Sequence, residues 1–306
     1  MHAVRFHTTG SPDVMVLEDA PRPGVADDEI LIEVRAAGIN PVDTKTRLGV
    51  VETHGPMPVV PGREVSGIVV ETGRAVRACS IGDEVFALLH RHGGGYAELA
   101  TAAAGEWAAK PETLDHIHAA AVPLAALTAW QGLFDHGGLR RGQTVLVHGA
   151  GGGVGHFAIQ LARHAGARVV GTAPSADLDL VSRLGADIVI DYGAMPFQRV
   201  VTDVDVVLDL VAGPTQVRSW SVLRPGGRLV SSLGPPERSE DAPPEATGTG
   251  FLVRPDAEQL AGIARLIDDG RLRVVVSRIL PLAEARRAHT LLEERHSQGK
   301  SVLRVR

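Results

Sequence analysis

The stretch TVLVHGAGGGVGHFAIQLARHAGARVVGTA, residues 144–173, decides the fold of the central part of the chain. It opens with a short apolar run at 144–148 and continues with a glycine-rich turn at 149–155. Apolar residues then recur at helical spacing as far as Gly166, and a second apolar run follows at 168–172. The order strand, turn, helix, strand predicts one βαβ unit of a parallel sheet.

The glycines of this turn predict a site for a dinucleotide. Gly152 would let the backbone approach a pyrophosphate, and Gly155 would let the helix pack closely on the strand. Free N–H groups at the start of the helix would bind the phosphate charge. Ala150 stands where the usual GxGxxG pattern has its first glycine, and a tight turn without a ligand is the alternative. The predicted contacts are Gly149, Ala150, Gly151, Gly152, Gly153, Val154 and Gly155.

Composition narrows the class of protein. Hydrophobic residues make up 44% and charged residues 22% of the 306 residues, which is ordinary for a globular protein. The net charge of −5 argues against nucleic acid or an anionic membrane as a partner. The N-terminus has no signal-peptide core, and no apolar run reaches the length of a membrane span. Cys79 is the single cysteine, so no disulfide forms within the chain, and we expect a cytoplasmic protein.

The chain divides by pattern. Residues 1–115 carry short apolar runs separated by glycine and proline turns, which predicts a β-barrel-like domain. A helix-rich link occupies 116–138, and strands then alternate with helices over 144–233, as in a doubly wound parallel sheet. The polar, Pro/Gly-rich segment 234–250 is read as a loop near the cofactor or a crossing between domains, with a disordered surface loop as the alternative.

Seven short motifs outside the glycine turn carry a family resemblance. In their order and spacing they resemble the zeta-crystallin-like quinone oxidoreductases, zinc-independent members of the medium-chain dehydrogenase/reductase superfamily. The motifs are AAGINPVDTKTRLG (36–49), PGREVSG (61–67), IGDEVFA (81–87), GGYAEL (94–99), AAAVPLAALTAWQGL (119–133), PLAEARRAH (281–289) and GKSVLRV (299–305).

The resemblance implies an α/β architecture in which a doubly wound parallel Rossmann domain is inserted into a mostly β, GroES-like catalytic domain. The catalytic domain would comprise residues 1–117 and 254–306, and the dinucleotide-binding domain residues 118–253. The active site would lie in the cleft. The resemblance also implies a nicotinamide cofactor, usually NADPH, and commonly a homodimer.

The same resemblance predicts that no metal takes part. Zinc-dependent relatives have a cysteine where this chain has Asn40, and a histidine where it has Arg63. A catalytic zinc needs three protein ligands, so two of the expected ligands are missing. The cofactor must then carry the chemistry. The protein binds and orients the cofactor and the acceptor, and it polarises the acceptor.

Hydride transfer to an electron-poor carbon builds negative charge on an acceptor oxygen, which hydrogen-bond donors would stabilise. By resemblance, Asn40 and Lys45 are the predicted catalytic residues, because a lysine or tyrosine at the position of Lys45 faces the nicotinamide in many relatives. Residue types alone favour solvated loop charges for Lys45 and Arg47 and a turn cap for Asn40. We keep the solvated reading for Arg47, and expect Asp43 to be a structural hydrogen-bond acceptor.

Further cofactor contacts are implied along the central domain. Thr128 matches a threonine that relatives place against the nicotinamide, with simple packing as the alternative. Phe251 and Val253 belong to a segment where relatives present backbone groups to the carboxamide. Leu233 and Gly234 end a strand of the doubly wound sheet, where such folds bind ligands.

The cofactor's second phosphate depends on the residues after the second strand. An NAD-specific unit carries an acidic residue there, whereas this chain has the neutral residues Thr172, Ala173 and Ser175. They leave room for a 2′-phosphate, to which Ser175 could donate, although Ser175 and Asp177 also suit helix capping. Relatives often supply a basic residue just beyond these positions. Arg183 or Tyr192 could compensate for its absence in this chain. The prediction is NADPH, with NADH not excluded.

These inferences predict a zinc-independent NAD(P)H-dependent oxidoreductase. It would transfer hydride to a quinone or an α,β-unsaturated carbonyl, a small-molecule substrate. The alternative is a nicotinamide-binding redox sensor or crystallin-like protein with little turnover. NADPH oxidation with a panel of quinones and enones separates the two readings.

Overall fold

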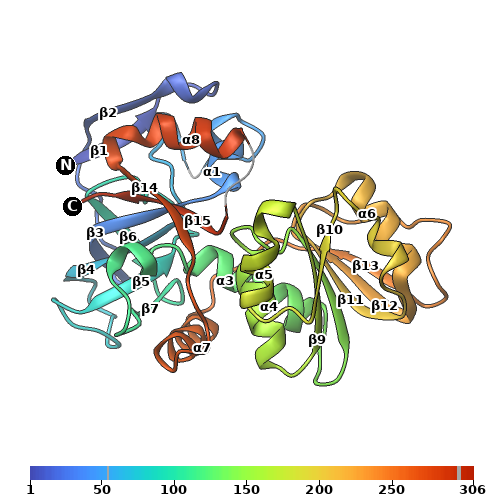
Figure 1. Cartoon of the computed structure of the whole chain (residues 1–306). Coiled ribbons are helices and arrows are strands. Elements are labelled where there is room, and N and C mark those ends of the chain that lie inside the picture. The colour runs from blue at the N-terminus through green and yellow to red at the C-terminus, as the bar shows by residue number, and fades with distance from the viewer. Residues whose placement is uncertain (54, 295–297) are drawn as a thin grey trace. The chain divides into compact units, whose positions relative to one another are not determined.

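The computed structural model describes residues 1–53, 55–294 and 298–306. The chain forms two compact units, shown in Figure 1. The β unit comprises Met1–Leu124, Arg254–Asp269 and Val274–Arg306, and the α/β unit comprises Ala125–Val253 and Gly270–Arg273. Relative to the domain boundaries expected from the sequence, residues 118–124 pack with the β unit and residues 270–273 with the α/β unit.

The β unit is built mainly on antiparallel pairing, with one parallel pair between its two C-terminal strands. Strands β1 (His2–Phe6) and β2 (Met15–Asp19) form a two-stranded sheet. A seven-stranded sheet has the order β14-β15-β3-β4-β5-β7, with β6 also paired to β3. Its strands are β3 (Glu29–Ile39), β4 (Glu64–Thr72), β5 (Glu84–Leu88), β6 (Leu99–Ala103), β7 (Trp107–Ala109), β14 (Val276–Pro281) and β15 (Lys300–Arg304). The helices are α1 (Pro41–Arg47), α2 (His116–Ala119), α7 (Ala257–Asp268) and α8 (Ala285–Glu293).

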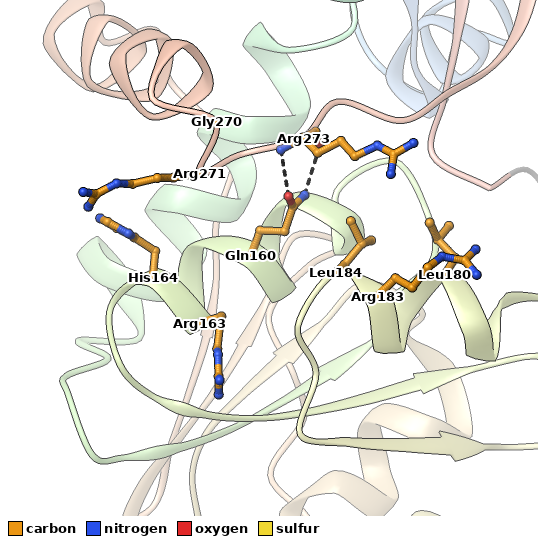
Figure 2. Close-up of a pocket in the computed structure, with 9 residues that line it drawn as sticks. All are labelled: Gln160, Arg163, His164, Leu180, Arg183, Leu184, Gly270, Arg271 and Arg273. Carbon is orange, nitrogen blue, oxygen red and sulfur yellow. Dashed lines mark hydrogen bonds between the residues drawn. The ribbon is translucent and has the colours of Figure 1, made fainter.

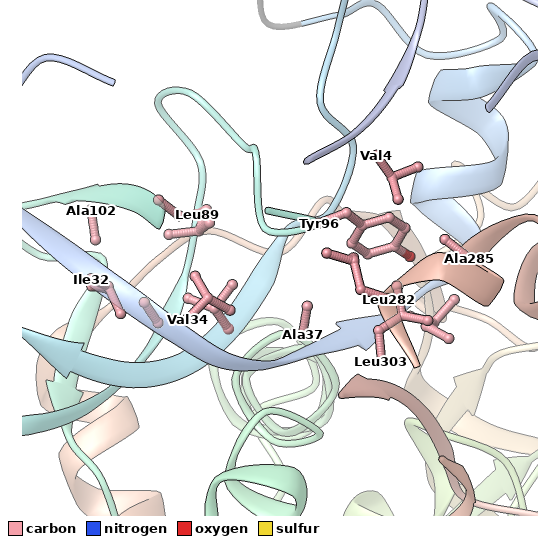
Figure 3. Close-up of a cluster of buried hydrophobic side chains, with 14 of the residues drawn as sticks. Val4, Ile32, Val34, Ala37, Leu89, Tyr96, Ala102, Leu282, Ala285 and Leu303 are labelled. Atoms are coloured by element: carbon pink, nitrogen blue, oxygen red, sulfur yellow. The ribbon is translucent and has the colours of Figure 1, made fainter. Parts of the chain in front are cut away.

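The C-terminal tail returns to the N-terminal segment, as the resemblance implied. Strand β15 pairs antiparallel with β3, from Ser301 opposite Ile39 to Arg304 opposite Ala36, and the red and blue strands lie side by side in Figure 1. Leu282 and Leu303 from the tail are buried in the same apolar cluster as Val34 (Figure 3). Burial of one such leucine stabilises a fold by roughly 1.5–3 kcal/mol, so the tail is an integral part of this core.

The α/β unit has six parallel strands in the order β10-β9-β8-β11-β12-β13. Counted from β8, this is the 3-2-1-4-5-6 order of the dinucleotide-binding fold, which confirms the doubly wound sheet. The chain order reverses between β8 and β11. The strands are β8 (Thr144–His148), β9 (Arg168–Ala173), β10 (Ile188–Asp191), β11 (Val204–Asp209), β12 (Leu223–Ser231) and β13 (Thr247–Gly250).

Helices of the α/β unit connect these strands. They are α4 (Gly155–His164), α5 (Leu178–Arg183) and α6 (Gly213–Ser219). Before β8, α3 (Pro123–Trp130) continues into a π-helical turn, Gln131–His136, and the boundary between the two units falls within α3. No helix among the described residues is long and apolar enough to cross a membrane.

The segment 234–250 is a loop over 234–246, as expected from the sequence, and a strand over its last four residues. Its last four residues form β13, which pairs parallel with β12 from Thr247 opposite Arg228. The sequence TGTG lacks the bulky side chains typical of strands, so pairing with β12 rather than local preference makes this strand. The preceding residues are also held, because Trp220 Nε1 donates to the Glu237 carbonyl at 2.8 Å and the Arg238 guanidinium lies over the Trp220 ring. These residues are therefore neither a disordered surface loop nor a crossing between domains, and their nearness to the cofactor stays a prediction.

Candidate cofactor and catalytic sites

The glycine turn joins the end of β8 to the start of α4. A Cβ at Gly155 would lie 2.1 Å from the Gly149 carbonyl oxygen and 2.7 Å from Ala150 Cα, so only glycine lets the helix begin this close to the strand. At Gly152 the nearest atom to a Cβ would be the Gly149 carbonyl oxygen at 3.3 Å. The two glycines thus differ: Gly155 is required by packing, whereas Gly152 leaves its backbone open to a ligand.

The other sequence-predicted cofactor residues of the α/β unit, apart from Thr128, follow strand ends. Because all six strands are parallel, their carboxyl ends share one edge of the sheet. Thr128 is buried within α3 instead. The positions are Thr172 and Ala173 at the end of β9, Ser175 just beyond it, Tyr192 after β10, Leu233 and Gly234 after β12, and Phe251 and Val253 after β13.

Asp209 at the end of β11 was missed by sequence reasoning. This carboxylate is fully buried and accepts hydrogen bonds from the Val211 and Ala212 amides at 3.1 and 2.9 Å, and from Ser231 Oγ at 3.0 Å. Ala212 has φ 62° and ψ −165°, a strained conformation for a residue with a Cβ. The loop beside the reversal point of the sheet is therefore held in one shape. Val211 beside it is 51% exposed, an apolar side chain available to a ligand.

His148 at the end of β8 was also missed, because a histidine ending a strand carries no motif. It is fully buried, with Nδ1 3.0 Å from Thr172 Oγ1 and Nε2 2.9 Å from Ser219 Oγ. Burial lowers its pKa to about 4, so the ring is neutral near pH 7 and one nitrogen donates while the other accepts. His148 therefore ties β8 to β9 and α6, and it engages the hydroxyl of a predicted cofactor residue.

Carboxylates lie beside two of the predicted cofactor residues, Ser175 and Gly151. Ser175 Oγ donates to Asp191 Oδ2 at 2.5 Å, and this hydroxyl holds the pKa of the Asp191 carboxyl below its usual range. The Asp177 carboxylate lies against Gly151, where a Cβ would be 2.6 Å from Oδ2. Asp177 precedes α5 but makes no side-chain cap. The Ser175 proton is thus already directed to a carboxylate, a feature that sequence reasoning did not anticipate.

In the β unit, a hydrogen bond from a backbone amide to a side chain stabilises the start of α1. Asn40 precedes Pro41, the first residue of the helix. The backbone amide of Asn40 donates to Asp43 Oδ2 at 2.8 Å. The structural acceptor role predicted for Asp43 is therefore confirmed. The Asn40 side chain also bonds to two other buried groups.

Asn40, Glu64 and Lys300 form the Lys300 cluster, and each is at most 4% exposed. Lys300 Nζ donates to Glu64 Oε1 at 2.7 Å, to the Ile39 carbonyl at 3.2 Å and to Asn40 Oδ1. Asn40 Nδ2 also donates to Glu64 Oε1 at 2.7 Å. Glu64 Oε2 accepts from the Leu124 amide at 2.8 Å. An ammonium ion thus occupies the centre of three oxygen acceptors and contacts Asn40, one of the two positions that were compared with zinc ligands.

Lys45 and Arg47 stand on the same helix in opposite environments. Lys45 is exposed, and its carbonyl accepts from the Val50 amide at 2.9 Å. Arg47 is fully buried: Nε donates to His289 Nδ1 at 3.2 Å, and the guanidinium also donates to Gly10 and Glu293. The solvated role predicted for Arg47 is therefore wrong. Its partners on α8 lie more than 240 positions away in sequence, so no local pattern could reveal them.

Asp43 is a buried carboxyl group with an unusual titration. Oδ2 also accepts from the Tyr96 hydroxyl at 3.2 Å, whereas Oδ1 has no hydrogen-bond partner among the described residues. Burial raises the pKa of Asp43 to about 7. The unfolded value is about 3.9, so the folded chain binds more protons between these limits. Asp43 therefore lowers stability progressively as the pH rises from about 4 to about 7.

We expect Asp43→Asn to remove this loss. Its free energy of unfolding should rise relative to wild type as the pH rises from 4 to 7, by an amount on the order of a few kcal/mol. Wild type alone is a poor reporter, because burial lowers the pKa of His289 to about 3, and that group acts with the opposite sign. Urea denaturation of both proteins across the range measures the difference, and a difference that does not change with pH would contradict the assignment.

The parallel 3-2-1-4-5-6 sheet with its glycine turn, joined to a separate β unit, defines a dinucleotide-dependent dehydrogenase or reductase. Comparisons with known proteins agree. Residues 26–112 match the alcohol dehydrogenase GroES-like domain, and residues 184–303 match the zinc-binding dehydrogenase family. The chain belongs to the quinone oxidoreductase-like family of the medium-chain dehydrogenase/reductase superfamily.

Three similar proteins illustrate the relationship. The quinone oxidoreductase of Sus scrofa is 33% identical over 99% of this chain and 97% of its own length. The chloroplastic NADPH-dependent alkenal/one oxidoreductase of Arabidopsis thaliana is 34% identical over 99% of this chain and 79% of its own. The structure of the quinone oxidoreductase from Coxiella burnetii superimposes with a TM-score of 0.91 at 35% identity, covering 100% of this chain and 99% of that one.

The open position at Gly152 leads to a direct test. Gly152→Val would place a branched side chain where a pyrophosphate must approach, so NADPH affinity should fall by about two orders of magnitude or more while the protein stays folded. Titration calorimetry and the melting temperature measure the two effects. Gly24→Val is the matched control, because a Cβ there meets nothing within 4 Å. Undiminished NADPH affinity in folded Gly152→Val would show that the turn is only structural.

Proposed function

We propose that this protein is an NADPH-dependent oxidoreductase that transfers hydride to a quinone or an α,β-unsaturated carbonyl compound. The observation that carries the proposal is the glycine turn, packed tight at Gly155 and open at Gly152, at the strand-end edge of a 3-2-1-4-5-6 sheet. The acceptor class is supported by the names of two similar proteins, a quinone oxidoreductase and an alkenal/one oxidoreductase. The rival reading, a redox sensor or crystallin-like protein with little turnover, has no such support.

When bound, the reduced nicotinamide supplies a hydride to the β-carbon of the acceptor. The acceptor's double-bond electrons then move toward its carbonyl oxygen, which needs a positive or hydrogen-bonding partner and finally a proton. Lys45 is proposed for this role because its ammonium is exposed at the end of α1 while its backbone is fixed by the Val50 amide. Asn40 keeps one Nδ2 hydrogen beyond its bond to Glu64, and the Lys300 cluster fixes the orientation of its carboxamide.

The decisive experiment follows the hydride. NADPH deuterated at the transferred C4 position should deliver deuterium to the β-carbon of an enone product. An enone is a better probe than a quinone, because hydroxyl hydrogens of a reduced quinone exchange with water. Cofactor binding without deuterium in any product, across a panel of enones and quinones, would favour the sensor reading instead.

NADPH is proposed over NADH, on the neutral end of β9 and on the NADPH-dependent relative. The Ser175–Asp191 pair opposes this choice, since an ionised carboxylate suits a ribose hydroxyl better than a 2′-phosphate. Dissociation constants for both cofactors decide the matter. Equal or tighter binding of NADH would refute the preference.

Metal independence is part of the proposal. Asn40 and Arg63 replace two zinc ligands of the zinc-dependent relatives, and the Lys300 ammonium fills the space between the Asn40 and Glu64 oxygens. Elemental analysis should find no stoichiometric zinc, and a chelator should leave turnover unchanged. Activity lost on chelation and restored by zinc would overturn this prediction.

The assembly and location are proposed as a homodimer in the cytoplasm. Strand β13 is an edge strand of the parallel sheet and can pair with a second copy. Light scattering after size-exclusion chromatography tests the dimer, and a monomer mass at micromolar concentration would refute it. Fractionation of the source cells tests the location.

A further inference from the structure

A cavity lies in the α/β unit, away from the glycine turn. It has a volume of about 520 Å³, within the range of small-molecule sites. We call it the basic pocket. Its lining residues, drawn in Figure 2, are Gln160, Arg163 and His164 of α4, Leu180, Arg183 and Leu184 at α5, and Gly270, Arg271 and Arg273 of the segment that returns toward the tail.

The buried side-chain amide of Gln160 holds one wall of the basic pocket in place. Gln160 is 8% exposed, and its Oε1 accepts from the Arg273 amide at 2.7 Å while its Nε2 donates to the Arg273 carbonyl at 2.9 Å. These two bonds, the dashed lines of Figure 2, fasten residues 270–273 to α4. A third bond, from Nε2 to the His156 carbonyl at 2.8 Å, orients the amide itself. The wall that carries Arg271 and Arg273 is therefore held in place.

The charge of the basic pocket is one-sided. Four of the nine lining residues are arginines and one is histidine, and none of the nine is acidic, in a chain whose net charge is −5. Arg163 pairs with Asp187 at 2.8 Å outside the pocket lining. Within the described part of the chain, no carboxylate pairs with Arg183 or Arg273. A bound anion would therefore offset the positive charge of Arg183 and Arg273.

Helix dipoles account for only part of this cluster. Arg163 and His164 stand in the last turn of α4 and Arg183 in the last turn of α5, where cations are favoured. Arg271 and Arg273 belong to no helix, so this reason does not apply to them. Two helix ends and the fastened segment 270–273 thus contribute positive charge to one cavity.

We propose that the basic pocket binds a small anion carrying two or more phosphate groups. Guanidinium groups present paired N–H donors that match phosphate oxygens, and Arg183 and Arg273 have theirs available. Leu180 and Leu184 form an apolar wall that suits the organic part of a phosphate ester. This site is separate from the glycine turn, because the pocket uses the C-terminal half of α4 and the turn ends at the first residue of that helix. The proposal does not depend on the proposed function.

The test is calorimetric titration of the full-length protein with inorganic pyrophosphate and with ADP, at physiological ionic strength. NADPH at saturation keeps these probes out of the glycine turn. One site is expected, and Arg183→Gln/Arg273→Gln should weaken it by about tenfold or more. The matched control is Arg140→Gln/Arg199→Gln, which removes the same charge from exposed positions outside the pocket.

The two probes distinguish the source of the phosphate. Tighter binding of ADP indicates a nucleotide whose base uses the leucine wall, whereas tighter binding of pyrophosphate indicates a free polyphosphate; either supports the site. The proposal is wrong if neither probe binds at millimolar concentration, if the pocket variant binds like wild type, or if the control weakens binding equally. Gly152→Val should lose NADPH yet keep pyrophosphate in the basic pocket, so this proposal and the proposed function can fail separately.

Discussion

Lys300→Met is expected to lower the free energy of unfolding by about 3–5 kcal/mol, because it leaves the Glu64 carboxylate buried without its counter-charge. Glu64 is fully buried and Lys300 is 4% exposed, so water cannot replace the lost ammonium. Asn40 would lose a donor to its Oδ1 at the same time. Urea denaturation near pH 7 measures the change.

Two comparisons make this result specific. Glu64→Gln/Lys300→Met removes both charges and keeps an acceptor for the Leu124 amide, so it should recover a large part of the lost stability. Arg287→Met breaks an exposed ion pair with Glu284 and should cost no more than about 1 kcal/mol. A loss of the same small size for Lys300→Met would mean that the Lys300 cluster is open to solvent.

Lys45→Met is expected to lower kcat by about 10²–10³, the usual effect of removing a donor that strengthens its bond to a developing oxyanion. Stability and NADPH affinity should be nearly unchanged, because the Lys45 side chain is exposed. Stopped-flow oxidation of NADPH with an enone reports the chemical step.

Whether Lys45→Met changes kcat or KM shows which role Lys45 has. A raised KM with normal kcat would show uniform binding of substrate and transition state, which contradicts the proposed role. Lys45→Arg keeps the charge and should restore part of kcat if electrostatic stabilisation dominates. Arg74→Met is the surface control, since its side chain is 94% exposed on the same unit, and it should turn over normally.

The sequence by itself determined the doubly wound half of the protein. Strand, glycine turn and helix in residues 144–173 follow each other without interruption, and each is specified by neighbours within a few positions. The glycine spacing also distinguished Gly155 from Gly152, because close packing and ligand approach are backbone requirements of single residues. The return of the tail to the N-terminal domain came from family resemblance, since no local pattern encodes it.

Only the tertiary structure decided which polar groups lose their water. Pairing of β15 with β3 brings Lys300 to Asn40 across 260 positions, and the packing of α8 buries Arg47 against His289. Strand β13 exists because β12 offers it an edge, and the basic pocket exists because Gln160 fastens residues 270–273. Composition and periodicity describe neighbours along the chain. Desolvation and charge pairing depend on neighbours in space, and contacts between distant parts of the chain bring these neighbours together.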